Sequence, residues 1–476
     1  MEKHWIGGQW QDSSDVGSMP VINPATEEVL ADIPLGTVAD ADAAVFHARA
    51  ATRQWAGLGP SGRRPILAEA AHRIQQGADA IARILTAENG KPLPQARAEV
   101  MGAANWLREF SELAVHYRVG SQSASADELV FQRWEPRGVA ACIIPWNFPL
   151  QIAMEALAPN LAVGNTVVIK PSEKTPLSLA LMVSTAFGHL PSGVLNLLLG
   201  DGTHAGEALI QHPGVDVVMF VGSVRTGRHV GEVSGAKTRK AILELGGKDA
   251  FIVDRDVNIQ AAARLVADSC FANSGQICTS TERVFVHAEI LDEFLDALVS
   301  ITEAYRMGDG TEDGVDLGPL VDHLQLATVE RHVIDAVAKG AKVIAGGERL
   351  PRSGYFFPPT IILLPEQDQS LLMRQETFGP VAPVVPFDTF DQAIALANDS
   401  TYGLASVVYS NDANHVMQAI EELKTGMVKI NARRGKAPGA TSEPFGASGV
   451  GYGYGSEVLA ELTRQKSIQW RKMPLE

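Results

Sequence analysis

Cys278 is the residue whose side chain offers the most reactive chemistry in this sequence. The chain of 476 residues has only three cysteines, at positions 142, 270 and 278. This odd, sparse count disfavours a disulfide framework, and the absence of a Cys-x-x-Cys pair disfavours a structural zinc site, so no metal is expected. Two interpretations of Cys278 remain, a small buried hydrophobe and a nucleophile. A nucleophilic thiol needs an exposed sulfur and a setting that favours the thiolate, and Gly275 could supply the necessary turn.

Two polar residues could act beside such a thiol. Glu244 ends an apolar run in ELGGK, where it is either a solvated carboxylate at a strand end or a general base. Partial burial would raise its pKa towards the working range of a base. Asn147, in PWNFPL, is either the cap of a rigid turn or an amide that donates to a developing oxyanion. The residues alone leave both interpretations open for each.

Two further stretches have the composition of dinucleotide-binding turns. IKPSEKTP follows an apolar strand and contains Lys170, Ser172 and Glu173. A helix cap explains Ser172, whereas Lys170 and Glu173 could bind ribose hydroxyls. FVGSVRTG places Gly222 and Ser223 before a helix, which is a weak signal for a phosphate at a helix N-terminus.

Two loops complete the set of candidates. RQETFGP contains Glu376 and Phe378, and a polar loop with a packed phenylalanine explains it equally well. NARRGKAP contains Arg433 and Arg434 within an acidic chain. It is either a solvated loop or a clamp for an anionic substrate.

The elements that would position these residues alternate along the chain. From residue 138 to 253, short apolar strands such as 166–170 and 249–253 alternate with helical patterns such as 203–211, which predicts a parallel sheet covered on both faces. A second α/β pattern is expected from about residue 260 to 430, after an Ala- and Arg-rich helical region at 42–88. Ligands of such sheets lie at the carboxyl ends of the strands. KSIQW at 466–470 predicts a terminal strand that pairs with another element or subunit.

The bulk composition excludes several classes of protein. A hydrophobic content of 46% with 20% charged residues is typical of a folded chain. The net charge of −15 disfavours a nucleic-acid partner. The N-terminus lacks the pattern of a signal peptide, and no apolar run is long enough to cross a bilayer. We therefore expect a cytoplasmic protein without a membrane partner.

Taken together, these stretches resemble the NAD(P)-dependent aldehyde dehydrogenase superfamily. Ten short motifs follow the order of that family and span nearly the whole chain. They are WIGGQW, NPATEEVL, ENGKPL, PWNFPL, KPSE, the GS-x-x-x-G stretch, ELGGK, GQ-x-C, E-x-FGP and PFG. The resemblance implies that Cys278 attacks an aldehyde to give a thiohemiacetal and then a thioester. Asn147 and the Cys278 backbone N–H would hold the oxyanion, and Glu244 would activate the water that releases the acid.

The same resemblance implies a cofactor, either NAD or, as a second choice, NADP. Lys170, Ser172 and Glu173 would hold the adenosine ribose, with Glu173 favouring NAD. The remaining cofactor residues would meet the pyrophosphate and the nicotinamide end: Gly222, Ser223, Trp146, Leu245, Glu376 and Phe378.

The implied fold is α/β, with two parallel-sheet domains and a small oligomerisation hairpin. A Rossmann-like cofactor domain would comprise residues 1–117 and 137–246, and a catalytic domain residues 247–447. Residues 118–136 and 448–476 would build a homodimer or homotetramer.

The resemblance implies a small-molecule aldehyde as the substrate, and the sequence points to two classes of aldehyde. The cationic loop with Arg433 and Arg434 favours a carboxylate-bearing semialdehyde. GQIC-x-STER resembles benzaldehyde-type members and favours an aromatic aldehyde. Trp106, Phe110 and His116 are expected to line the substrate tunnel. The resemblance also leaves room for a CoA-acylating enzyme and for a non-catalytic member of the fold.

One segment departs from the family pattern. PFGASGVGYGYGSE, at 444–457, is shorter than usual, and Tyr452 and Gly453 stand where Arg-Glu is common. We expect this change to leave the catalytic set untouched and to alter the substrate mouth or the subunit contacts.

Overall fold

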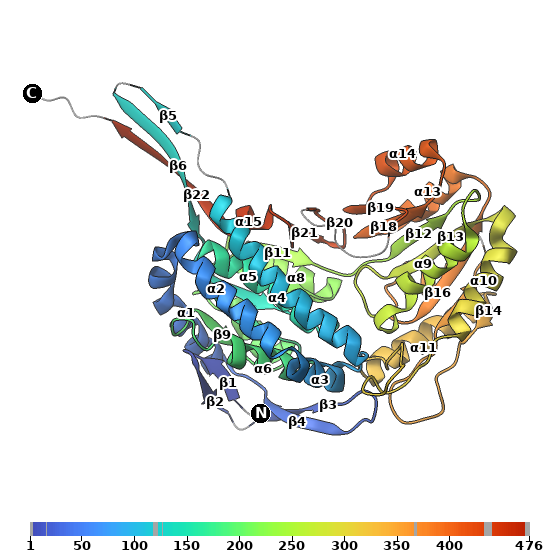
Figure 1. Ribbon diagram of the computed structural model, residues 1–476, viewed down its shortest axis with the longest axis horizontal. Coiled ribbons are helices and arrows are strands. Elements are labelled where there is room, and N and C mark those ends of the chain that lie inside the picture. Colours follow the sequence, from blue (N-terminus) through green and yellow to red (C-terminus); the bar gives the residue numbers. More distant parts are fainter. Residues whose placement is uncertain are drawn as a thin grey trace, which may run out of the picture.

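A computed structural model describes residues 3–15, 17–117, 122–125, 127–365, 369–432 and 440–471. Figure 1 shows two large α/β bodies side by side and a narrow sheet that projects away from them. The α/β class expected from the sequence is confirmed.

The first sheet has eight strands, of which the central five are parallel. In spatial order they are β2 (Gln9–Asp12), β1 (Lys3–Ile6), β9 (Leu195–Leu197), β8 (Thr166–Lys170), β7 (Val139–Ile143), β10 (Val217–Val221), β11 (Lys240–Glu244) and β21 (Gly449–Val450). The central strands are almost wholly buried, as continuous apolar runs covered on both faces should be.

Helices cover both faces of this sheet. Those on one face are α2 (Gly59–Gln76), α3 (Ala78–Asn89), α4 (Leu93–His116), α5 (Pro149–Val163), α6 (Leu177–Ala186) and the short α15 (Val458–Glu461). Those on the other are α1 (Val38–Gly57), α7 (Glu207–Gln211) and α8 (Val224–Ala236). The helix expected at 203–211 is a π-helical turn, η1 (Gly202–Gly206), followed by α7. Thr37 starts α1 through a capping box with Asp40.

The second sheet has seven strands, parallel except for β14. In spatial order they are β14 (Lys342–Ala345), β15 (Thr360–Leu363), β16 (Val381–Phe387), β13 (Thr281–His287), β12 (Asp249–Val253), β18 (Ala405–Tyr409) and β19 (Met427–Ile430). The prediction of one sheet running from 138 to 253 is therefore wrong at its end, because β12 pairs with β13 and β18.

Helices also cover both faces of the second sheet. One face carries α9 (Ile259–Phe271) and α10 (Leu291–Glu303). The other carries α11 (His323–Ala338), α12 (Leu371–Arg374), α13 (Phe390–Asn398) and α14 (Ala413–Glu422). Two 3₁₀ turns, η2 (Ala272–Gly275) and η3 (Ala288–Ile290), flank β13.

The projecting sheet joins distant parts of the chain. The terminal strand β22 (Thr463–Arg471) pairs along its length with β6 (Glu128–Pro136), which also pairs with β5 (Gln122–Ala124). The expected terminal strand thus finds its partner within the same chain. Two small ribbons remain, β3 (Ser18–Ile22) with β4 (Val29–Pro34), and β17 (Tyr402–Gly403) with β20 (Phe445–Gly446).

Candidate active site

Cys278 follows a strained turn between α9 and β13. Asn273, Ser274 and Gly275 have φ angles of 51°, 55° and 73°, so three successive residues adopt the left-handed conformation. Only glycine fits at 275, because a β-carbon there would lie 2.0 Å from the carbonyl oxygen of Gly379. This turn leaves Cys278 partly exposed, as a nucleophile requires.

The other two cysteines have the opposite environment. Cys142 and Cys270 are fully buried, and burial raises the pKa of both thiols far above the ordinary value. Of the three cysteines, Cys278 alone combines exposure with a position on a cavity.

Two cavities meet at Cys278. The first has a volume of about 270 Å³ and the second about 220 Å³. Both are lined by Cys278, Asn147, Ile152 and Val221. A reagent in one cavity and a reagent in the other would therefore meet at the sulfur.

Asn147 is buried at the junction of the two cavities. Its Nδ2 donates to the backbone oxygen of Gln276 at 3.1 Å. An amide nitrogen carries two hydrogens, so this bond leaves one for an oxygen near the sulfur. PWNFPL forms the turn from β7 to α5, at the carboxyl end of the sheet.

Glu244 is the last residue of β11 and lines the first cavity together with Cys278. The antiparallel strand β21 pairs Gly449 with Glu244. The chain then continues to Gly453, which lines the same cavity and lies against the Glu244 carboxyl group. Tyr454 lines the cavity as well.

This arrangement corrects one expectation from the sequence. The atypical 444–457 segment does reach the predicted catalytic set, because Gly453 and Tyr454 share a cavity with Glu244 and Cys278. The pairing of β21 with β11, across more than 200 residues of chain, brings it there.

The second cavity contains six of the nine predicted cofactor residues. They are Trp146, Gly222, Ser223, Leu245, Glu376 and Phe378. Ser223 caps α8 by accepting from Thr226 N, which leaves the first N–H groups of that helix at the cavity. Gly222, which has no side chain, and this helix N-terminus fit a pyrophosphate. The aromatic pair Trp146 and Phe378 fits a planar ring beside Cys278.

Glu376 has an unusual electrostatic setting in this cavity. Its Oε1 accepts from Gly247 N at 2.9 Å. Burial, followed by the charge of the neighbouring Glu282, raises the pKa of Glu376 to about 8.

The other three predicted cofactor residues lie at the end of β8. Lys170 is buried, and its Nζ lies 3.9 Å from Glu173 Oε2. Burial lowers the pKa of Lys170, while the charge of Glu173 opposes that shift. Ser172 is buried and accepts from Lys174 N at 3.3 Å. These residues are not among those that line the cavity at Cys278.

The structure does not bring the predicted tunnel residues to the thiol. Trp106 and Phe110 stack on each other at 5.6 Å, with Phe110 buried in the core below the first sheet. His116 is exposed at the end of α4. None of the three lines either cavity. Arg433 and Arg434 lie outside the described residues.

Several lining residues were not predicted. Gln325 and Thr328 of α11 line the second cavity, and Gln151, Glu155 and Lys429 line the first. Gln325 Nε2 donates to the backbone oxygens of Thr377 and Phe378 at 2.8 and 2.9 Å. The i, i+3 and i, i+4 spacings within α5 and α11 were the available signal.

Two other features, a metal-binding cluster and a membrane-spanning helix, are not found among the described residues. No group of three or more His, Cys, Asp or Glu side chains in those residues could hold a metal ion. Among the same residues, no helix has the length and apolarity to cross a membrane.

Comparison with known proteins shows the family to which the chain belongs. The sequence model of the "Aldehyde dehydrogenase family" matches residues 10–468. Phenylacetaldehyde dehydrogenase of Pseudomonas fluorescens is 37% identical, over 97% of this chain and 94% of its own length. A probable succinate-semialdehyde dehydrogenase [NADP(+)] of Sinorhizobium fredii is 39% identical, over 90% of this chain and 88% of its own.

A solved structure shares the whole architecture. Betaine aldehyde dehydrogenase of Staphylococcus aureus, in complex with NAD+, superposes with a TM-score of 0.94 at 32% identity, covering 98% of this chain and 94% of its own. The chain therefore belongs to the aldehyde dehydrogenase family, and it oxidises an aldehyde with NAD(P)+ as the acceptor of the hydride.

Proposed function

We propose that Cys278 is the nucleophile of this reaction, with Asn147 and Glu244 as its catalytic partners. The observation that carries the proposal is the position of the partly exposed Cys278 at the junction of two cavities. One cavity would take the aldehyde and the other the nicotinamide end of the cofactor.

In the first step, the Cys278 thiolate adds to the aldehyde carbon and forms a C–S bond. The carbonyl electron pair moves to oxygen, and the resulting oxyanion accepts hydrogen bonds from Asn147 Nδ2 and from the Cys278 backbone N–H. The product of this step is a thiohemiacetal on the protein.

In the second step, the oxyanion re-forms the carbonyl, and hydride leaves the carbon to give a thioester. When bound, the cofactor's nicotinamide ring accepts that hydride. Trp146 and Phe378, whose ring centroids lie 5.4 Å apart, would hold the ring against Cys278 and exclude water.

In the third step, Glu244 takes a proton from a water molecule as that water attacks the thioester carbon. The tetrahedral intermediate then collapses, the C–S bond breaks, and Cys278 leaves as thiolate. The carboxylic acid departs through the first cavity.

For the cofactor we retain the assignments made from the sequence. Lys170, Ser172 and Glu173 would bind the adenosine ribose, and the Glu173 carboxylate would repel a 2′-phosphate. NAD is therefore the proposed physiological cofactor. A higher kcat/KM with NADP than with NAD would contradict that choice.

The lining of the first cavity favours an aldehyde with an apolar, neutral body. Most of its lining is apolar, including Phe148, Met219 and Phe220. Two carboxylates, Glu155 and Glu244, and one ammonium, Lys429, also line it, so the charge does not favour a second carboxylate. An aromatic aldehyde is thus the first candidate.

A carboxylate-bearing semialdehyde is the second candidate, since Lys429 lies in the cavity and Arg433 and Arg434 follow it in the chain. Kinetic constants for phenylacetaldehyde and succinate semialdehyde compare the two classes. A semialdehyde substrate would have a low KM that rises in Lys429→Met and Arg434→Ala proteins. If the kinetic constants are equal for both aldehydes and do not change in these variants, a semialdehyde is excluded as the preferred substrate.

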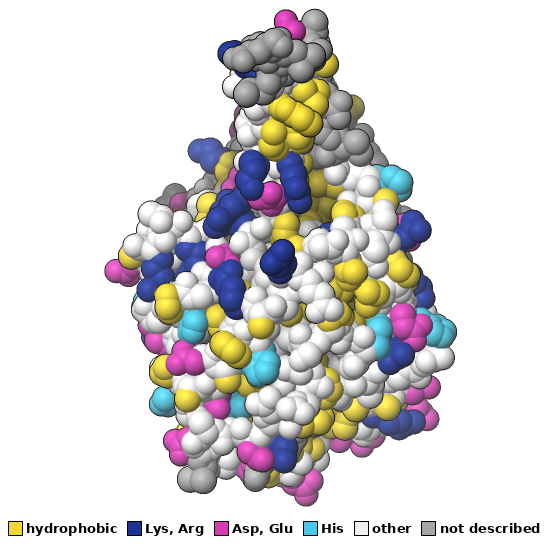
Figure 2. Space-filling model, turned by 90° about the vertical axis from the view of Figure 1, so that its left-hand side faces the viewer, with side chains coloured by type: hydrophobic (Ala, Val, Ile, Leu, Met, Phe, Trp, Pro, Cys, Tyr) yellow, Lys and Arg dark blue, Asp and Glu magenta, His cyan; other side chains and the backbone are white. Residues whose placement is uncertain are grey.

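We also propose that the enzyme is a cytoplasmic homodimer or homotetramer assembled through the projecting sheet. Figure 2 shows hydrophobic side chains on this projection and Lys and Arg side chains at its base. Trp470 on β22 is 68% exposed, which an assembled sheet would cover. The mass of the protein in solution tests this assembly.

An aldehyde panel tests the function as a whole. Formation of reduced cofactor and release of acid without CoA are expected in the parent protein and not in Cys278→Ala. A Cys278→Ala protein with parental turnover would refute the mechanism. Formation of an acyl-CoA thioester when CoA is added, with no acid released until that thioester is hydrolysed, would identify a CoA-acylating enzyme instead.

A further inference from the structure

Two buried lysine–glutamate pairs flank the candidate active site, one in each α/β body. Lys91 Nζ lies 2.5 Å from Glu99 Oε2, and both side chains are 1% exposed. Lys248 Nζ lies 2.6 Å from Glu282 Oε2, with exposures of 0% and 5%. Replacing a buried ion pair by apolar residues is often neutral or stabilising, so these pairs need an explanation other than stability.

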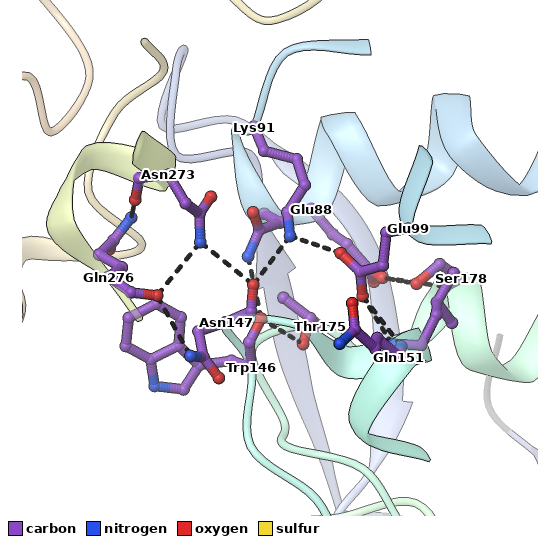
Figure 3. Close-up of polar contacts among 12 residues, drawn as sticks. Glu88, Lys91, Glu99, Trp146, Asn147, Gln151, Thr175, Ser178, Asn273 and Gln276 are labelled. Atoms are coloured by element: carbon purple, nitrogen blue, oxygen red, sulfur yellow. Dashed lines mark hydrogen bonds and ion pairs between the residues drawn. The ribbon is translucent and has the colours of Figure 1, made fainter. Parts of the chain in front are cut away.

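The first pair holds both sides of the turn that carries Asn147. Lys91 Nζ donates to the Asn147 backbone oxygen at 2.8 Å, and it lies 4.0 Å from the Phe148 ring centroid. Glu99 Oε1 accepts from Leu150 N at 2.9 Å and Gln151 N at 3.2 Å, which belong to the first turn of α5. Figure 3 shows the bond from Lys91 reaching Asn147 and the bonds of Glu99 reaching the start of α5 at Gln151.

The same turn is tied to the cysteine loop. Asn273 Nδ2 donates to the Asn147 backbone oxygen at 3.2 Å, and Asn147 Nδ2 donates to Gln276 O at 3.1 Å. Lys91 and Glu99 therefore contact the same turn that Asn273 and Gln276 bond to the loop ending at Cys278 (Figure 3).

The second pair holds the turn that carries Glu376 and Phe378. Glu282 accepts from Thr377 N at 2.7 Å and from Phe378 N at 2.8 Å. Lys248 Nζ donates to Thr377 Oγ1 at 3.2 Å. Phe378 has a φ of 53°, a conformation that a phenylalanine adopts only when surrounding bonds hold it.

The two held turns meet across the second cavity. Trp146 and Asn147 line it from one body, and Glu376 and Phe378 line it from the other. The Trp146 and Phe378 rings make a T-shaped contact between them. Each pair thus places one wall of the space beside Cys278.

We infer that these pairs are positioning residues with separate tasks: Lys91–Glu99 fixes the oxyanion-binding amide of Asn147, and Lys248–Glu282 fixes the cofactor-binding turn Glu376–Phe378. The inference rests on the proposed function for the roles of Asn147 and Glu376. Loss of the first pair should therefore lower kcat, and loss of the second should weaken cofactor binding.

Two double variants test this division because each removes both members of a pair and leaves no uncompensated buried charge. They are K91M/E99Q and K248M/E282Q, with E69Q/R73M, an exposed pair on α2, as the control. Cofactor binding is measured without aldehyde, from quenching of tryptophan fluorescence. Turnover is measured at saturating cofactor and divided by the amount of alkylatable Cys278.

We expect K91M/E99Q to lose about 10- to 100-fold in kcat while its Kd for NAD+ stays unchanged. We expect K248M/E282Q to bind NAD+ about tenfold more weakly when Kd is measured at about pH 9, where Glu376 is mostly ionised in both proteins, with a smaller loss of kcat at saturation. The exposed control should match the parent in both quantities.

Equal losses of both quantities in the two variants would show a general structural role and overturn the inference, as would parental values in either variant. If a double variant does not fold, K91Q/E99Q or K248Q/E282Q replaces it, since each is also free of buried charge and keeps polar groups that can bond to the turn. The Kd measurement needs no aldehyde, so it stays readable even if the parent protein oxidises none of the panel. A parent protein that oxidises no aldehyde of the panel would refute the proposed function, and the Kd values would still test the positioning of Glu376 and Phe378.

Discussion

Gly453 lies directly against Glu244, and a β-carbon on Gly453 would come within 2.1 Å of Glu244 Oε1. Real atoms cannot approach so closely, so the present position of the carboxyl group depends on the missing side chain at 453. Because Glu244 is the proposed base for thioester hydrolysis, this contact links the atypical C-terminal segment to one chemical step.

Gly453→Ala is therefore expected to displace the Glu244 carboxyl group and to slow hydrolysis by about 10- to 100-fold. Hydride transfer precedes this step, so rapid mixing should show a burst of one reduced cofactor per active site before slow turnover. Gly102→Ala is the control, since a β-carbon on Gly102 in α4 meets nothing within 4 Å. Steady-state turnover at the parental rate in Gly453→Ala would contradict the proposed contact.

The turn before Cys278 gives a second prediction, which separates backbone strain from a clash. Gly275 and Gly340 both have positive φ angles, 73° and 96°, but only a β-carbon at 275 meets other atoms. Gly340→Ala should destabilise the protein by about 1 kcal/mol through its backbone alone. Gly275→Ala should cost several kcal/mol, on the order of 3 or more, because Gly379 must also move.

Chemical unfolding of the two glycine variants measures this difference. The alkylation rate of Cys278 should also change in Gly275→Ala and stay parental in Gly340→Ala, since only the first turn places the thiol. Equal stabilities for the two variants would mean that the approach to Gly379 does not restrict position 275.

Much of this site follows from local sequence, because its residues sit at the ends of short buried strands. The apolar run at 166–170 predicted β8 with its correct bounds, and the glycine of GQICTS predicted a turn that exposes Cys278. In both cases neighbouring residues determine the structure, through burial in one and backbone conformation in the other.

The parts that were missed depend on pairing between distant segments. The strand 249–253 was predicted, but its apolar pattern does not say which of two parallel sheets it joins. Gly453 reaches Glu244 only through the antiparallel pairing of β21 with β11. Glu282 likewise binds a turn 96 residues away, and no local pattern marks that contact.

Glu88 gives a prediction for the pH dependence of stability. Burial raises its pKa to about 7 from the ordinary value of 4.5, although it accepts bonds from Leu177 N and from Ser178 N and Oγ. The folded protein thus holds this proton more tightly than the unfolded chain. Protonated Glu88 therefore adds to the free energy of unfolding. This contribution is complete below about pH 4.5, and up to about 3 kcal/mol of it is lost as the pH rises through about 7.

Glu88→Gln, which does not titrate, should remove that part of the pH dependence. Thermal midpoints of the parent and the variant, measured from about pH 5 to about pH 8, should converge or cross as the pH rises. Glu109→Gln, an exposed position on α4, is the control and should follow the parent. Parallel curves for the parent and Glu88→Gln would show that Glu88 titrates normally.

Glu376 should make cofactor binding depend on pH in the opposite sense. Its pKa is raised to about 8 by burial and by the charge of Glu282, so it is mostly protonated at neutral pH without cofactor. The ionised carboxylate is the stronger acceptor for ribose hydroxyls and the better neighbour for a cationic nicotinamide. The affinity for NAD+ should therefore rise between about pH 7 and about pH 9.

The variant Glu376→Gln isolates this titration from the hydrogen bond itself. Its amide still accepts one hydrogen bond but does not titrate, so its weaker affinity for NAD+ should be flat over the same pH range. Fluorescence titration with NAD+ at each pH compares the two proteins. A parental affinity that falls with pH, or a Gln variant that keeps the rise, would place the titrating group elsewhere.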